Sequence, residues 1–152
     1  MSDVKPKRTS RVVVRWDGEQ RFDGTRLGSE HSIHMDGTGA TGPSPVDALL
    51  CALAACTGVD VASILEKRRT PVDGFSIEVV GDRADATPAR LTKIVLHYRM
   101  RGAGIERVHA ERAIELAVTK YCSVRDSLGS DIAVEWTLEL ESQLNSRRAS
   151  TR

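Results

Sequence analysis

The sequence predicts an α+β fold built largely on antiparallel sheet. Three strand-like segments come first, followed by a long apolar helix, two strands, a second helix and a last strand. Runs of strands separated by single helices are typical of this class. The 152 residues can bury a sizeable core. We therefore predict one domain over residues 11–141, between a polar tail at 1–10 and a basic tail at 142–152.

The first part of the chain indicates three short strands. Their residues are β-branched or alternate in polarity, and turn signals follow them. The segments are residues 11–16, 21–27 and 30–35. A loop rich in Gly, Thr and Pro follows at residues 37–45.

A helix is predicted to begin at the end of this loop. Ser44 suits the N-cap, Pro45 suits the first helical position, and Asp47 stands three residues after Ser44, as in a capping box. Residues 48–55 are apolar without exception. A helix that is apolar all round is expected to lie in the core, and this one is too short to be read as a membrane span.

The remaining elements are predicted from the period of the apolar positions. Gly58 is expected to separate the first helix from a second helical stretch. Alternating apolar positions predict strands, and apolar positions three or four apart predict helices. The helical segments are 59–67, 105–121 and 123–128, and the strands are 75–80, 91–100 and 132–140.

Composition narrows the partners that the chain is expected to have. Lys and Arg total 22 against 21 Asp and Glu, a net charge of +1. Such a balance gives no electrostatic reason to bind nucleic acid or an anionic membrane. The N-terminus lacks the apolar segment of a signal peptide. We therefore expect a cytoplasmic protein.

Two of the three cysteines stand out by position. Cys56 lies in the apolar helix, and Cys122 ends the amphipathic helix 66 positions later. Cytosolic cysteines that pair usually do so transiently and in catalysis. Each could also be a buried structural thiol, because free Cys is among the most buried residue types. Cys51, about 140° round the helix from Cys56, is expected to fill the core.

The surroundings of the two thiols differ. A buried thiol needs a nearby cation or helix N-terminus to become reactive. No basic residue lies within one turn of Cys56, so an activating cation would come from elsewhere, and the N-terminal strands carry several arginines. Cys122 precedes a short helix, whose backbone N–H groups, with Lys120 and Arg125, would favour its thiolate.

A metal site is not expected. Zinc needs clustered ligands at characteristic spacings. His31 and His34 stand three apart on a predicted strand and would point to opposite faces, whereas His97 and His109 are isolated.

Two segments resemble the cysteine motifs of the OsmC/Ohr family, and in detail its YhfA-type branch. The first runs from Ser44 to Cys56 and continues through residues 60–65, and the second is residues 120–124. The likeness extends over roughly residues 11–140. It implies an OsmC-like α+β fold, with antiparallel sheets wrapped around two central helices in an intertwined homodimer.

The resemblance also implies a reaction, the reduction of organic hydroperoxides in the oxidative stress response. Cys56 would be the peroxidatic thiolate, oxidised to a sulfenic acid. Cys122 would resolve it as an intrachain disulfide, and an external dithiol would reduce the disulfide, with no bound cofactor.

One position departs from the family pattern. The peroxidatic enzymes place a Glu ten residues before the first Cys, where it orients an activating Arg; here that residue is Val46. Asp47 is the nearest carboxylate, and Arg26 is the candidate arginine. The alternative is therefore a non-enzymatic OsmC-like dimer that binds a small hydrophobic ligand or senses oxidants.

Overall fold

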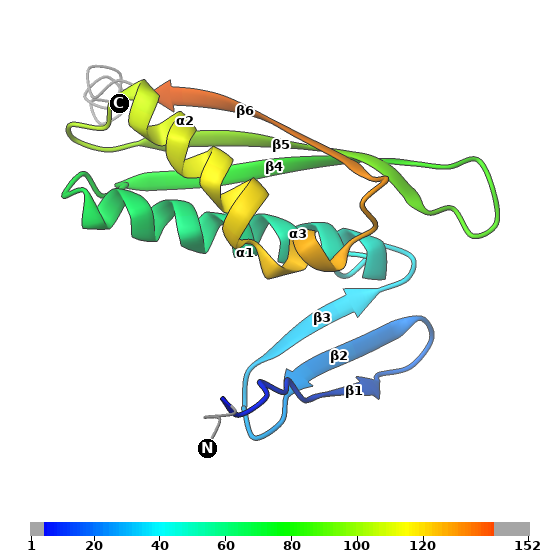
Figure 1. Ribbon diagram of the computed structural model, residues 1–152. Coiled ribbons are helices and arrows are strands. Elements are labelled where there is room, and N and C mark those ends of the chain that lie inside the picture. Colours follow the sequence, from blue (N-terminus) through cyan, green and yellow to red (C-terminus); the bar gives the residue numbers. More distant parts are fainter. Residues whose placement is uncertain (1–4, 142–152) are drawn as a thin grey trace, which may run out of the picture. The chain divides into compact units, whose positions relative to one another are not determined.

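The computed structural model in Figure 1 describes residues 5–141. The chain forms two compact units, residues 1–49 and 50–152, which are described in turn. The single domain over 11–141 stays a prediction. The basic tail at 142–152 lies outside the described residues, as do the first four residues of the polar tail. Lys5–Ser10 has no regular secondary structure.

The first unit contains an antiparallel three-stranded sheet in the order β1-β2-β3. Its strands are β1 Val12–Trp16, β2 Arg21–Arg26 and β3 Ser32–Asp36. Trp16 pairs with Phe22 across a tight turn, in which Gly18 (φ +88°) and Glu19 (φ +50°) take left-handed conformations. All three predicted strands are present.

Asp36 organises the loop after β3. Its buried carboxylate accepts hydrogen bonds from the backbone N–H and the hydroxyl of Thr38, at 2.9 and 2.8 Å. The same two groups of Thr41 donate to it at 3.1 and 2.8 Å. These donors, that of the Thr38 backbone first, hold the pKa of Asp36 well below its usual range.

Replacing Asp36 by Asn is expected to lower the thermal unfolding midpoint at pH 7, since Asn keeps the shape but loses the charge that four donors face. A carboxyl whose pKa is depressed by folding stabilises the protein above its unfolded pKa of about 4. This stabilisation is lost as the pH falls through the folded pKa. The difference in midpoint between wild type and variant should therefore narrow from pH 7 to pH 3, as measured by circular dichroism. A difference that stays constant or widens would contradict this role.

A long helix, α1, runs without interruption from Pro45 to Lys67. The predicted capping box is present: the Ser44 N–H donates to the Asp47 carboxylate at 3.0 Å, and the Asp47 N–H donates to the Ser44 hydroxyl at 3.2 Å. The expected separation at Gly58 is absent, because one glycine costs a helix only about 1 kcal/mol and tertiary packing outweighs that cost.

The second unit contains a three-stranded sheet in the order β4-β5-β6, with helices on one of its faces (Figure 1). The strands are β4 Gly74–Arg83, β5 Leu91–Arg101 and β6 Ala133–Glu141. β4 and β5 pair antiparallel, but β6 pairs parallel with β5. The last strand thus departs from the antiparallel pattern. The helical connection between β5 and β6 crosses over the sheet, and a crossover of this kind permits parallel pairing.

The core of this unit lies between the sheet and its helices. α1 contributes Leu53, Val61 and Leu65, each with no exposed surface. The helix α2, Arg107–Leu116, is followed by a short π-helical segment, η1, Ala117–Tyr121, and by α3, Ser123–Ser127. Alternate residues of β5 complete the core: Ile94, Leu96, Tyr98 and Met100.

α1 is buried on one side only. Thr57 and Val61 are fully buried, whereas Val59 is 70% exposed and Cys51 is also exposed. The predictions of a helix buried all round and of Cys51 as a core residue were therefore wrong, because a helix against a single sheet covers one face. α1 has 23 residues and contains an 18-residue stretch with a mean hydropathy of 2.0, so by length and composition it could cross a membrane. One such helix is weak evidence for a span, because core helices of soluble proteins pass the same test.

Candidate active site

Cys56 and Cys122 are free thiols that neighbour one another, since the Cys56 side chain is among the groups that raise the pKa of Cys122. Cys56 is half-buried on α1, and Cys122 is 3% exposed at the end of η1. One thiol is thus accessible to solvent while its neighbour is enclosed.

The π-helical turn sets the position of Cys122. The Cys122 N–H bonds to the carbonyl of Ala117, five residues earlier, at 3.0 Å. The backbone then leaves the helix, and Cys122 becomes the N-cap of α3, where its Sγ accepts the N–H of Arg125 at 3.2 Å. The expectation that this sulfur lies near backbone N–H groups is confirmed. The predicted single helix over 105–121 instead divides into α2 and η1.

Burial decides the protonation of Cys122. Desolvation raises the pKa of this thiol to about 11, with a further rise from the neighbouring Cys56, while the N–H groups of Arg125 and Val124 lower it. Because burial outweighs the N-cap, Cys122 is a neutral thiol at pH 7. The expected thiolate at Cys122 was therefore wrong.

The cations next to Cys122 in the sequence are engaged elsewhere. Arg125 donates through its guanidinium to the carbonyls of Ile132 at 3.0 Å and Gly129 at 3.4 Å. The Lys120 ammonium lies 5.4 Å from the centre of the Tyr121 ring. Both charged groups thus contact partners other than the sulfur of Cys122.

Two buried hydroxyl groups adjoin the thiols, and sequence reasoning missed both. Tyr98 donates to the Thr57 hydroxyl at 2.7 Å, and Thr57 donates to the Ala54 carbonyl at 3.0 Å. Burial raises the pKa of Tyr98 to about 12, although the bond to Thr57 lowers it, and a charge on Cys122 adds to the rise. The one signal in the sequence was that Thr57, a polar residue in an apolar helix, follows Cys56 directly.

A groove of about 550 Å³ separates α1 from α2. Its α1 wall includes Asp60, Ser63 and Lys67, which continue the helical stripe of Cys56 at spacings of four, seven and eleven residues. Ala113 and Leu116 of α2 give it an apolar side, and Tyr121, the residue before Cys122, also lines it. Neither Cys56 nor Cys122 lines the groove, which begins at Asp60, one helical turn after Cys56.

The other predicted site residues belong to the first unit. Asp47 caps α1 through Ser44, and Arg26 is exposed at the end of β2, paired with Val12. The cysteines belong to the second unit, so the roles of Asp47 and Arg26 at the thiols stay predictions.

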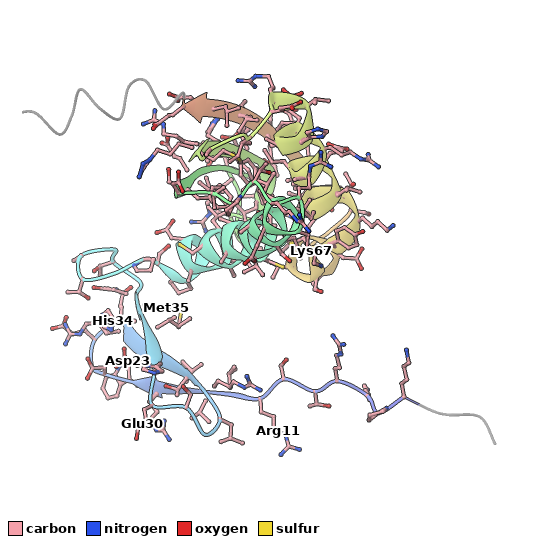
Figure 2. The ribbon with its side chains drawn as sticks, turned by 90° about the vertical axis from the view of Figure 1, so that its left-hand side faces the viewer. Arg11, Asp23, Glu30, His34, Met35 and Lys67 are labelled. Atoms are coloured by element: carbon pink, nitrogen blue, oxygen red, sulfur yellow. The ribbon has the colours of Figure 1, made fainter. Side chains whose placement is uncertain are left out.

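Asp17, Asp23 and His34 form a cluster in the first unit that the sequence did not reveal, because strand pairing brings Asp23 and His34 together from 11 positions apart. Their ligand atoms lie within 4.8 Å of one another, and Figure 2 shows Asp23 and His34 on neighbouring strands. Both ring nitrogens of His34 are engaged, with Asp23 at 2.7 Å and Thr41 at 2.9 Å. A metal ion would have to displace one of these partners.

The fold and the paired cysteines agree with comparisons to known proteins. The family model described as OsmC-like protein matches residues 37–137. The chain is 33% identical over 128 residues to Protein YhfA of Escherichia coli K12, an alignment that covers 84% of this chain and 95% of that protein. The chain belongs to the OsmC family.

Solved structures show the same OsmC-like fold. The OsmC-like protein of Mycoplasma pneumoniae matches with a TM-score of 0.76 at 17% identity, covering 90% of this chain and 100% of that one. The organic hydroperoxide resistance protein OhrB of Bacillus subtilis matches with a TM-score of 0.58 at 17% identity, covering 86% and 98%. The predicted family and α+β class are thus confirmed.

Proposed function

We propose that this OsmC family protein is a thiol-dependent organic hydroperoxide reductase in which Cys56 attacks and Cys122 resolves. The contact between a half-buried Cys56 and an enclosed Cys122 is the observation that carries the proposal. An attacking thiol must meet a substrate from solvent, and a resolving thiol needs only to reach its partner. The raised pKa of Cys122 agrees with this division, because a neutral thiol is the weaker nucleophile.

The reaction has two steps on the protein. The Cys56 thiolate attacks one peroxide oxygen, the O–O bond breaks, and the other oxygen leaves with a proton as the alcohol, which gives a sulfenic acid. The sulfur of Cys122 then attacks the sulfur of Cys56, and its proton and the hydroxyl group leave as water. An external dithiol reduces the disulfide by two thiol–disulfide exchanges.

The groove between α1 and α2 is the proposed place for the organic part of the substrate. Ile64, Ala113 and Leu116 offer it apolar contacts, and the groove follows the Cys56 stripe. The groove is also lined by charged residues, among them Asp60, Lys67 and Arg112, so its apolar part would hold the hydrocarbon portion of an organic hydroperoxide, which hydrogen peroxide lacks.

Turnover with a supplied dithiol tests the proposal. Cumene hydroperoxide should be consumed in many equivalents per chain when dihydrolipoamide is present, with one dithiol oxidised for each peroxide. Dithiol oxidation no faster than in the presence of heat-unfolded protein would reject the enzyme and leave the ligand-binding or oxidant-sensing alternative.

A homodimer is also proposed, because apolar surface is exposed on a single chain. Val59 projects from α1, and in the first unit Val12, Val14 and Ile33 are more than half exposed around a hollow of about 300 Å³. Exposed apolar surface of this kind marks interaction sites. A second copy of the chain would cover this apolar surface. We also propose a cytoplasmic location.

Replacing Val59 by Asp is expected to convert the dimer to a monomer, because the interface would bury an unpaired charge. Val108→Asp on α2 is the matched control, since Val108 is 62% exposed. Light scattering after gel filtration should give half the wild-type mass for Val59→Asp and the wild-type mass for Val108→Asp. A monomeric wild type, or a dimeric Val59→Asp variant, would contradict this interface.

A further inference from the structure

The turn of α1 that carries Cys56 is seated on the sheet by two separate contacts. Thr57 has no exposed surface, and its hydroxyl is bonded to that of Tyr98, which is 1% exposed on the central strand β5. Gly58 comes so close to β4 that an added Cβ would lie 3.3 Å from Ile77 and 3.7 Å from Phe75. The residues next to Cys56 therefore have little freedom to move relative to the sheet.

The hydrogen count excludes Tyr98 and Thr57 as proton donors to the thiols. Each hydroxyl has one hydrogen. Tyr98 gives its hydrogen to Thr57, and Thr57 gives its own to the Ala54 carbonyl. No hydrogen is left for sulfur, so neither hydroxyl can donate a proton to a thiol, and the hydrogen-bonded pair instead holds the turn that carries Cys56 in position.

Tyr98 is also coupled to the second thiol, since a charge on Cys122 raises the pKa of its hydroxyl. Its ring is held in place by Phe75, with centroids 6.2 Å apart and planes 23° apart. The same side chain thus contacts the turn that carries Cys56 and is coupled electrostatically to Cys122.

We infer that Tyr98 and Thr57 are positioning residues whose buried hydrogen bond fixes the approach of Cys56 to Cys122. This contact sets how readily the disulfide forms and how stable it is. The use of that disulfide in catalysis rests on the proposed function, whereas the geometric claim concerns disulfide formation itself.

The disulfide equilibrium tests the inference without any peroxide. Oxidised glutathione accepts two electrons from the Cys56–Cys122 dithiol, which yields the protein disulfide and two molecules of glutathione. The ratio of disulfide to dithiol at known glutathione concentrations gives the equilibrium constant. Every protein in this test carries Cys51→Ser, so that Cys56 and Cys122 are its only thiols.

Tyr98→Phe removes one hydroxyl, and Thr57→Val replaces a hydroxyl by a methyl group. Each is expected to lower the equilibrium constant by about tenfold, the scale of one lost buried hydrogen bond. Thr57→Ser keeps the hydroxyl and should restore the wild-type value. Disulfide closure after oxidation of Cys56 should slow in the same variants, whereas the first attack on peroxide should not.

Two controls separate positioning from general loss of stability. Ile94→Val removes one buried methyl group on the same face of β5, and it should lower the thermal midpoint without changing the disulfide equilibrium. Tyr121→Phe removes an exposed tyrosine hydroxyl next to Cys122 and should change neither. An unchanged equilibrium in Tyr98→Phe, an equal loss in Ile94→Val, or no rescue by Thr57→Ser would overturn the inference. If the glutathione equilibrium behaves as stated but no peroxide is turned over, only the proposed function fails.

Discussion

Replacing Cys56 by Ser is expected to reduce hydroperoxide turnover to the background rate, a loss on the order of a thousandfold or more. The serine hydroxyl is not ionised at neutral pH, and Cys122 cannot take over the attack, because burial raises its pKa to about 11 and leaves it 3% exposed. Peroxide consumption in the presence of excess dithiol measures the loss.

Cys51→Ser is the matched control for this variant. Cys51 lies on the same helix, is exposed, and does not share a face with Cys56. Its replacement should leave turnover within about twofold of wild type, as surface substitutions usually do. Full activity in Cys56→Ser, or a large loss in Cys51→Ser, would show that the attacking thiol has been assigned to the wrong residue.

Replacing Cys122 by Ser is expected to trap the oxidation state that Cys56 reaches first. Without a resolving thiol the sulfenic acid persists, and the chain gains the mass of one oxygen atom instead of losing two hydrogens. Cys56 is only half-buried, so excess peroxide should carry it onward to the sulfinic acid. Turnover with a dithiol should fall by about tenfold or more, because an external thiol must then reach Cys56 directly.

Intact-mass spectra over a peroxide titration measure this outcome. The serine in place of Cys122 still accepts the Arg125 N–H that now bonds to sulfur, so the N-cap of α3 is kept. The thermal midpoint should therefore stay near that of wild type. A Cys122→Ser chain that forms a disulfide within itself would imply that Cys51 resolves, and would contradict the account.

Local features of this protein could be predicted from its sequence. The reciprocal bonds of Ser44 and Asp47 depend on residues three apart, and the strands of both sheets follow from alternation over a few residues. The two cysteine motifs led to the correct family, because their residue types and spacing are specific together.

Features set by tertiary contacts could not be predicted. Tyr98 and Thr57 are 41 residues apart, and no local pattern indicates that their hydroxyls meet. The parallel pairing of β6 depends on the path of the crossover between β5 and β6. The sequence places apolar residues on all sides of the first part of α1, yet only one side packs against the sheet, and Val59 is exposed. Composition alone does not show which side of a helix the sheet covers.

The prediction of a thiolate at Cys122 was wrong for a similar reason. A position before a short helix suggested a stabilised thiolate, and the Arg125 N–H does lie at the sulfur. Burial by α1 and the sheet is a property of the whole unit, and it outweighs the local donors.

The most direct test of the central claim is the product formed with one equivalent of organic hydroperoxide. The fully reduced protein is oxidised, its remaining thiols are alkylated, and it is digested without reductant. We expect the chain to be lighter by two hydrogen atoms before alkylation, and the digest to contain a peptide pair joined through Cys56 and Cys122 together with alkylated Cys51. An unchanged mass, or a disulfide that joins two chains through Cys51, would contradict it.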